Sequence, residues 1–167
     1  MPTRFLHGSM YNRVIGEFLR ESSETRDRLN SATGEKIACF YLPDFQRPPV
    51  WSEQQNIRFL ESVWLELPIG VYVINTRLPF VNGKTHPFDM MLLDGQQRIR
   101  ALIAYKENKF PVFGHYFREL GEVEHRRFFQ FVFPRYEVSH TDINQLKEIY
   151  NRMNFGGTAH TLDQIAK

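Results

Sequence analysis

Apolar residues recur at helical spacing in four segments of the chain, each bounded by residues that start or stop helices. Ser52 and Gln55 have the form of a capping box at the start of one segment. Either Thr141 or Asp142 is placed to cap the last segment, which ends before two glycines. The pattern predicts helices over residues 10 to 30, 53 to 66, 96 to 108 and about 143 to 155.

Short runs of β-branched and aromatic residues between these segments predict strands. Phe129, Phe131 and Phe133 alternate with other residues, which is typical of a strand with one buried face. The predicted strands cover residues 37 to 42, 69 to 75, 88 to 93, 110 to 113 and 129 to 138. Because strands and helices do not alternate regularly, the pattern favours an α+β fold with a small mixed sheet and packed helices.

The polar first helix divides the chain into an N-terminal helical extension, residues 1 to 36, and a main domain, residues 37 to 167. Apolar residues make up 42% of the sequence, which is enough for a core. The sequence has neither an apolar run of about 18 residues nor a signal-peptide core, so we expect no membrane association. The single cysteine, Cys39, fits a reducing compartment, and we expect a cytoplasmic protein. A net charge of +2 is weak evidence for nucleic-acid binding.

The strongest candidate for chemistry is the segment Asp94-Gly95-Gln96-Gln97-Arg98, where a predicted strand turns into a predicted helix. The first N–H groups of a helix have no partner within it, and the helix dipole adds partial positive charge there, so the position suits an anion. Gly95 allows a tight turn and a close approach of a ligand to the backbone. Arg98 could hold a phosphate through two parallel hydrogen bonds.

Asp94 is the only acid in this segment, and its carboxylate could bind Mg²⁺ or accept a proton from water or a hydroxyl group. Gln96 and Gln97 cannot transfer protons near neutral pH, but their amides can orient a water, a sugar hydroxyl or a base edge. A purely structural alternative is that Asp94 caps the helix and Arg98 pairs with a surface acid. Spacing alone leaves both interpretations open.

Two further segments could close over the same ligand. Gln46 and Arg47 lie in a proline-stiffened loop, where holding an arginine in place costs little entropy. Arg152 and Asn154 supply hydrogen-bond donors before Gly156-Gly157, although an ordinary helix end also explains that segment. The sequence has no P-loop, zinc-site or serine-nucleophile motif, which disfavours those classes of enzyme.

Taken in order, these segments resemble the N-terminal domain of GmrSD-type modification-dependent restriction proteins. The resemblance covers roughly residues 37 to 162 and implies a ParB/sulfiredoxin-like fold. It also implies a domain that binds or hydrolyses a nucleoside triphosphate and couples this to DNA cleavage by a separate nuclease domain. The residues that carry it are Leu42-Pro43-Asp44-Phe45-Gln46-Arg47 with Trp51, Leu67-Pro68-Ile69, Asp94-Gly95-Gln96-Gln97-Arg98 and Asn154-Phe155-Gly156-Gly157-Thr158.

The residues and the resemblance together predict one nucleotide site. Asp94, Gln97 and Arg98 are its expected catalytic residues, with Asp94 as the ligand of Mg²⁺. The expected nucleotide- and phosphate-binding residues surround them: Gln46, Arg47, Gly95, Gln96, Arg152, Asn154, Gly156 and Gly157.

Restriction-type members continue into a helical part and a nuclease domain, whereas this sequence ends at Lys167. Their usual Leu-Ser near the closing motif is replaced here by His160-Thr161-Leu162. The expected partners are therefore a nucleoside triphosphate, DNA and a protein that supplies a nuclease domain. Three functions stay open: an Mg²⁺-dependent NTPase, phosphotransferase or nuclease; a nucleotide- or DNA-binding switch without turnover; and an inhibitor of a partner protein. The single acid in the main motif favours the switch over a two-metal nuclease.

Overall fold

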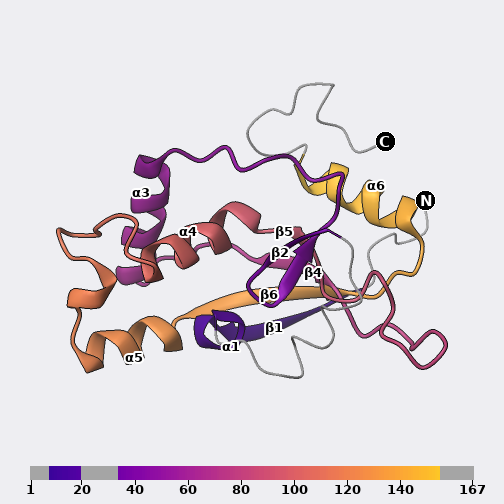
Figure 1. Ribbon diagram of the computed structural model, residues 1–167, viewed down its shortest axis with the longest axis horizontal. Coiled ribbons are helices and arrows are strands. Elements are labelled where there is room, and N and C mark those ends of the chain that lie inside the picture. Colours follow the sequence, from indigo (N-terminus) through magenta and orange to yellow (C-terminus); the bar gives the residue numbers. More distant parts are fainter. Residues whose placement is uncertain (1–7, 20–33, 155–167) are drawn as a thin grey trace.

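Six strands form one mixed sheet at the centre of the computed structural model, which describes residues 8–19 and 34–154 (Figure 1). The strands are β1 (Gly8–Val14), β2 (Glu35–Ile37), β3 (Phe40–Leu42), β4 (Tyr72–Asn75), β5 (Met91–Asp94) and β6 (Val132–Val138). Their order across the sheet is β1-β6-β4-β5-β3-β2. The pairs β6–β4 and β5–β3 are parallel, and the other three pairs are antiparallel. The predicted α+β class with a small mixed sheet is confirmed.

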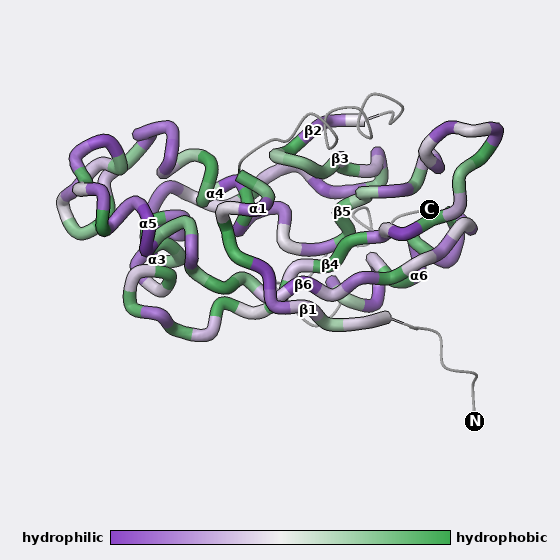
Figure 2. The backbone as a smooth tube through the Cα atoms, turned by 90° about the horizontal axis from the view of Figure 1, so that it is seen from below, coloured by the Kyte–Doolittle hydropathy of each residue, from purple (hydrophilic) through white to green (hydrophobic). Residues whose placement is uncertain are grey.

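Helices pack on both faces of this sheet. They are α1 (Ile15–Leu19), α3 (Glu53–Trp64), α4 (Gln96–Lys106), α5 (Glu122–Gln130) and α6 (Ile143–Asn154), with the short 3₁₀ helix η1 (Phe117–Glu119). The helices α3, α4 and α5 gather at one end of the molecule, and α6 lies at the other end (Figures 1 and 2). No helix among the described residues is long and apolar enough to cross a membrane.

Neighbouring side chains of β4 enter two different cores, because successive residues of a strand point to opposite faces. Tyr72 and Ile74 belong to the larger core, which also contains buried residues of α1, α3, α4 and α5. Val73 belongs to the smaller core, where Leu146 and Ile149 of α6 pack against the sheet. The adjacent strand β5 begins with the buried apolar residues Met91, Leu92 and Leu93 and ends at Asp94.

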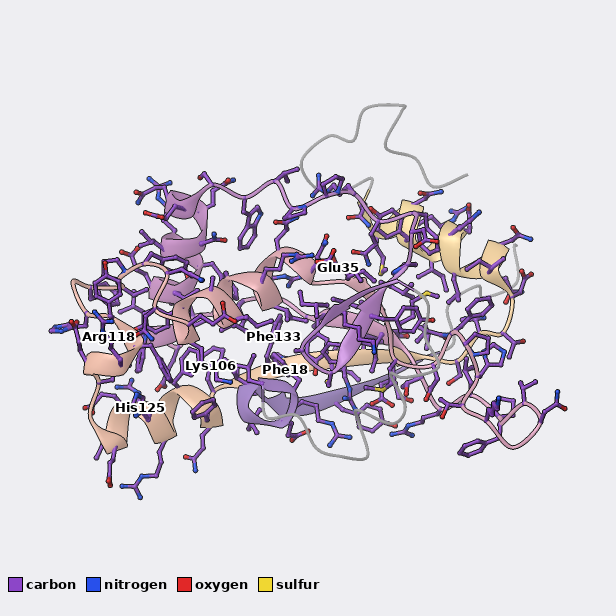
Figure 3. All side chains as sticks on the ribbon, viewed as in Figure 1. Phe18, Glu35, Lys106, Arg118, His125 and Phe133 are labelled. Atoms are coloured by element: carbon purple, nitrogen blue, oxygen red, sulfur yellow. The ribbon has the colours of Figure 1, made fainter. Side chains whose placement is uncertain are left out.

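Aromatic rings fix α1 on the larger core. The ring centroid of Phe18 lies 5.5 Å from that of Tyr72 and 6.2 Å from that of Phe133. Tyr72 and Phe133 are themselves 4.8 Å apart in an edge-to-face arrangement, which favours aromatic pairs beyond the area they bury. Phe18 and Phe133 are seen close together in the middle of the molecule (Figure 3).

The helix predicted over residues 10 to 30 is wrong for its first part. Gly8–Val14 form β1, which pairs with β6 along its whole length, and only Ile15–Leu19 are helical. The rest of the prediction lies outside the described residues. Because Ile15 and Phe18 are buried, this segment belongs to the core and is not a peripheral arm. Its strand partner is distant in sequence, so no local pattern indicated the pairing. The boundary proposed at residue 36 stays a prediction.

Three of the predicted strands are also corrected. Residues 37 to 42 reverse direction between β2 and β3, in a turn where Ala38 has a φ of 50°. Residues 110 to 113 contribute only an isolated bridge between Val112 and His115. Phe129 lies in α5, so the alternating phenylalanines do not share one strand. There the helix buries Phe128 instead, and the sheet buries Phe133.

The predicted helix starts are confirmed by their hydrogen bonds. The Ser52 hydroxyl accepts the N–H of Gln55 at 3.3 Å, and the Gln55 side chain accepts the N–H of Ser52 at 2.8 Å. This completes the capping box of α3. The Asp142 carboxylate accepts the N–H of Asn144 at 2.8 Å at the start of α6. Asp142, rather than Thr141, therefore supplies the bond that caps this helix.

Candidate functional site

A single glycine makes the turn between β5 and α4. Gly95 has a φ of 101°, in the left-handed region that side chains other than glycine rarely adopt. A β-carbon at this position would lie 2.6 Å from the β-carbon of Tyr72 on the neighbouring strand. Burial raises the pKa of the Tyr72 phenol above its usual range, so the side chain packed against the turn is neutral. Only glycine fits this turn without displacing the central strand.

Asp94 and Arg98 flank the turn and bind each other. A terminal nitrogen of the Arg98 guanidinium lies 2.6 Å from a carboxylate oxygen of Asp94, and the other donates to the carbonyl of Ile69 at 3.0 Å. The guanidinium carbon also lies 5.5 Å from the ring centroid of Phe133. The Arg98 side chain is 19% exposed and that of Asp94 is 35% exposed, so the pair is partly withdrawn from water. Both groups are held in place, and their charges cancel.

The two glutamines of the motif have different surroundings. The side-chain oxygen of Gln97 accepts the backbone N–H groups of Val50 and Trp51, each at 3.3 Å. Gln96 is only 7% exposed, and its side chain makes no hydrogen bond within the described part of the chain. Its amide is not one of the polar groups that the described residues seal from solvent without a partner, and Gln96 lines the cavity described below.

The loop with Gln46 and Arg47, which the sequence predicts to close over the same ligand, does lie against this motif. The Gln46 side chain donates to the carbonyl of Leu92 on β5, and the N–H of Arg47 donates to the hydroxyl of Tyr150 on α6 at 3.2 Å. Arg47 is half-buried and has no ion pair among the described residues. Within the described part of the chain it is therefore a cation at this site whose charge is not balanced by an acid.

The third predicted segment is only partly at the site. Asn154 reaches it from the end of α6 and donates to the carbonyl of Tyr150 at 2.8 Å. Arg152 is 73% exposed, pairs with Glu148 at 2.5 Å and does not line the cavity described below. Gly156 and Gly157 lie outside the described residues.

These groups surround a cavity of about 230 Å³ between the loop, the first turn of α4 and the end of α6. Four lining residues that sequence reasoning did not assign to the site are Trp51, Leu93, Tyr150 and Met153. Tyr150 and Met153 fall on the apolar stripe of α6, a pattern that indicates core packing and gives no sign of a site. Among the described residues, the lining is Gln46, Arg47, Trp51, Leu93, Asp94, Gly95, Gln96, Gln97, Arg98, Tyr150, Met153 and Asn154.

Two larger cavities lie elsewhere. One of about 960 Å³ lies between residues 66–71, α5 and the start of β6, and its lining is mostly apolar. Another of about 680 Å³ lies between β2 and the second half of α4. Neither contains a residue of the Asp94–Arg98 motif. By size alone, the 960 Å³ cavity would be the first candidate for a binding site. The 230 Å³ cavity is the better candidate, because an acid, cations, amides and the first turn of a helix line it.

The residues of this cavity suit Mg²⁺ only when the ion binds together with a phosphorylated ligand. Among the described residues no three histidine, cysteine or acidic side chains gather to hold a metal ion. Asp94 is the single carboxylate that the described residues supply to the cavity, and it is paired with Arg98. Mg²⁺ often binds through one or two carboxylates, substrate phosphates and waters. The site therefore suits an ion that arrives with a phosphorylated ligand and not one held by the protein alone.

Comparison with known proteins identifies the family. The model of the GmrSD restriction endonuclease N-terminal domain matches residues 26–131, which is more than half of the chain. The match includes the loop with Arg47 and the whole Asp94–Arg98 motif, and it ends before α6. No curated protein and no solved structure matched, so the ParB/sulfiredoxin-like fold name stays a prediction. The chain belongs to the GmrSD restriction endonuclease N-terminal domain family, which links it to DNA restriction and defence against phage.

Proposed function

We propose that the protein binds the phosphates of a nucleoside triphosphate in the 230 Å³ cavity and hydrolyses or transfers the terminal phosphate, as the nucleotide-processing part of a restriction system. The observation that carries the proposal is that Arg47, which has no ion pair among the described residues, lines the same cavity as the first turn of α4. A free cation and the N-terminus of a helix together favour an anion. Ligand pockets for drug-sized molecules measure about 300–1,000 Å³, so this cavity suits the phosphates and leaves the base outside.

Each residue then has a separate task. Arg47 neutralises phosphate charge, and the N–H groups of the first turn of α4 donate to phosphate oxygens. Asp94 would accept a proton from the attacking water or hydroxyl, and its hydrogen bond with Arg98 supports this role by holding the carboxylate in position. Mg²⁺ bound with the phosphates would be held by Asp94 and would stabilise charge that develops on the phosphate oxygens.

Binding without turnover is the second candidate. The observation that favours it is the 2.6 Å ion pair, which ties Asp94, the only carboxylate that the described residues supply to the cavity, to Arg98. In that case the protein would be a nucleotide- or DNA-controlled switch, or an inhibitor, that acts on a partner carrying the nuclease. The two candidates share the cavity and differ only in whether phosphate is released.

The test is phosphate release and nucleotide binding with each of the four NTPs and Mg²⁺, with and without DNA. We expect Arg47→Ala to weaken binding about tenfold or more, which corresponds to the loss of one charge-assisted contact. We expect Asp94→Asn to bind nucleotide but lose turnover. Arg118→Ala is the matched control, because Arg118 lies in η1, outside the cavity lining (Figure 3).

The outcomes separate the candidates. Phosphate release that Asp94→Asn abolishes and Arg118→Ala retains supports the enzyme. Saturable binding without phosphate release, by well-folded wild-type protein, supports the switch. If no NTP binds the wild-type protein under any of these conditions, the cavity is not a nucleotide site and the proposal fails.

A further inference from the structure

The motif contains two consecutive glutamines, Gln96 and Gln97, whose side chains have different contacts in the structure. Successive residues of an α-helix point about 100° apart, so Gln96 and Gln97 leave the first turn of α4 in different directions. Gln97 reaches the loop and accepts two backbone N–H groups. Gln96 lines the cavity and is 7% exposed, without a hydrogen bond in the described ranges.

We propose that Gln97 is a positioning residue that fastens the Arg47 loop to α4, and that Gln96 supplies the amide that contacts the bound ligand. The assignment of Gln96 rests on the proposed function, because it needs a phosphorylated ligand in the cavity. The assignment of Gln97 does not, because it concerns contacts in the unliganded protein. The two halves can therefore be judged separately.

The contacts of Gln97 suit it to a structural task. Pro48 and Pro49 have no N–H groups, so Val50 and Trp51 are the first backbone donors after them. One amide oxygen has two lone pairs and accepts both N–H groups. The Gln97 side-chain nitrogen is sealed from solvent and has no partner in the described part of the chain. A nitrogen enclosed in this way is poorly placed to orient water at the cavity.

The position of Gln96 suits a ligand contact. Gln96 lines the cavity, and its amide is not one of the polar groups sealed from solvent without a partner in the described part of the chain. The amide offers donors to phosphate oxygens and an acceptor to a sugar hydroxyl. The first turn of α4 lines the same cavity, so the amide and the helix end would act on one anion.

Stability of the unliganded protein provides the first test, because only Gln97 holds backbone groups of the loop. Methionine has the length of glutamine but neither a strong donor nor a strong acceptor. Gln96→Met removes no hydrogen bond within the described residues, and we expect the melting temperature to change by less than about 2 °C. Gln97→Met leaves two N–H groups without their acceptor and removes one unpartnered nitrogen, so we expect a net decrease of roughly 2–4 °C. A melting temperature that falls by more than about 2 °C with Gln96→Met or does not fall with Gln97→Met overturns the corresponding half.

Trp51 provides a direct report on the loop. In a Trp64→Phe background its emission is free of the second tryptophan of the chain. We expect Gln97→Met to increase acrylamide quenching of Trp51 about twofold, whereas Gln97→Glu, which keeps an acceptor, retains the quenching of the parent. Val50→Pro removes one of the two donors without changing α4, and it should act in the same direction as Gln97→Met. Unchanged quenching in both Gln97→Met and Val50→Pro overturns the positioning role.

Ligand binding separates Gln96 from Gln97. With Mg²⁺ and each NTP as the probe, we expect Gln96→Met to raise Kd about tenfold while Trp51 quenching in the free protein is unchanged. Gln96→Glu should weaken binding further, because its carboxylate repels phosphate. Equal affinity of Gln96→Met and wild type overturns the ligand contact. If the wild-type protein binds no NTP, the proposed function and the Gln96 contact fail together, while the quenching and melting data still decide the role of Gln97.

Discussion

Replacing Gly95 with alanine tests the turn on which the whole site depends. Gly95 has a φ of 101°, and a β-carbon there would lie 2.6 Å from the β-carbon of Tyr72 and 3.2 Å from its α-carbon. Tyr72 has no exposed surface and lies on the central strand β4, so it has little room to move away. Alanine therefore meets two separate penalties, one from the backbone conformation and one from the close contact.

The two penalties can be estimated separately. A left-handed conformation costs a residue other than glycine about 1–2 kcal/mol. Overpacking a well-packed interior costs about 1–3 kcal/mol. Gly95→Ala should therefore lower the free energy of unfolding by roughly 2–5 kcal/mol. Gly83 is the matched control, because its φ is 73° but a β-carbon there would meet nothing within 4 Å. Gly83→Ala should lose only about 1–2 kcal/mol.

Urea unfolding followed by circular dichroism measures both losses. If the slope with urea is unchanged, the shift of the midpoint converts directly into a change in stability. In thermal unfolding, each kcal/mol corresponds to about 2–4 °C for a chain of this size. Equal destabilisation by the two substitutions would refute the close approach of Gly95 to Tyr72.

Three other perturbations have defined outcomes. Ser52→Ala removes one bond of the capping box and should cost about 1 kcal/mol in urea unfolding. Glu137→Ala leaves its partner Arg135, whose side chain is 16% exposed, without its carboxylate and should cost about 3–5 kcal/mol; a loss below 1 kcal/mol would contradict a buried pair. Burial raises the pKa of the Tyr41 phenol above its usual range, so above about pH 10 the unfolded chain loses a proton that the folded chain keeps, and stability falls as the pH rises. Tyr41→Phe should reduce that fall by up to about 1.4 kcal/mol per pH unit between pH 10 and 11, and an unchanged slope would show that Tyr41 ionises normally.

Elements defined by local signals could be predicted from the sequence. The start of α3 follows from Ser52 and Gln55, whose side chains satisfy each other's backbone groups. The turn into α4 follows from Asp94-Gly95 after an apolar run. Both depend on neighbours within a few residues, which is the range over which capping and turn chemistry act.

Elements defined by distant partners could not be predicted. Gly8–Val14 pair with β6, which lies near the other end of the described chain, so only the folded sheet shows that they form a strand. Phe129 and Phe131 alternate as a strand would, but packing of α5 against α1 decides their conformation. The spacing of apolar residues predicts which residues are buried. Over a segment of a few residues it does not distinguish a turn of helix from a strand.

The same distinction applies to the site. The residue types were readable from the sequence, and the structure brings Gln46, Arg47, Asn154 and the Asp94–Arg98 motif to one cavity. The hydrogen bonds of these side chains could not be predicted, because their partners are backbone groups that any residue carries. The carbonyl of Ile69 holds Arg98, and the N–H groups of Val50 and Trp51 engage Gln97. Arg152 shows the converse, since it has a suitable side chain but pairs with Glu148 outside the cavity.

The ion pair determines how an anion can approach this site. Asp94 and Arg98 cancel each other's charge, so an incoming phosphate gains little from Arg98 unless it also separates the pair. Arg47 has no ion-pair partner among the described residues, and it lines the same cavity as the first turn of α4. The electrostatic attraction of the cavity therefore comes mainly from Arg47 and the helix end. For this reason Arg47→Ala should weaken phosphate binding, whereas Asp94→Asn leaves the charge of Arg98 uncompensated and should not weaken it.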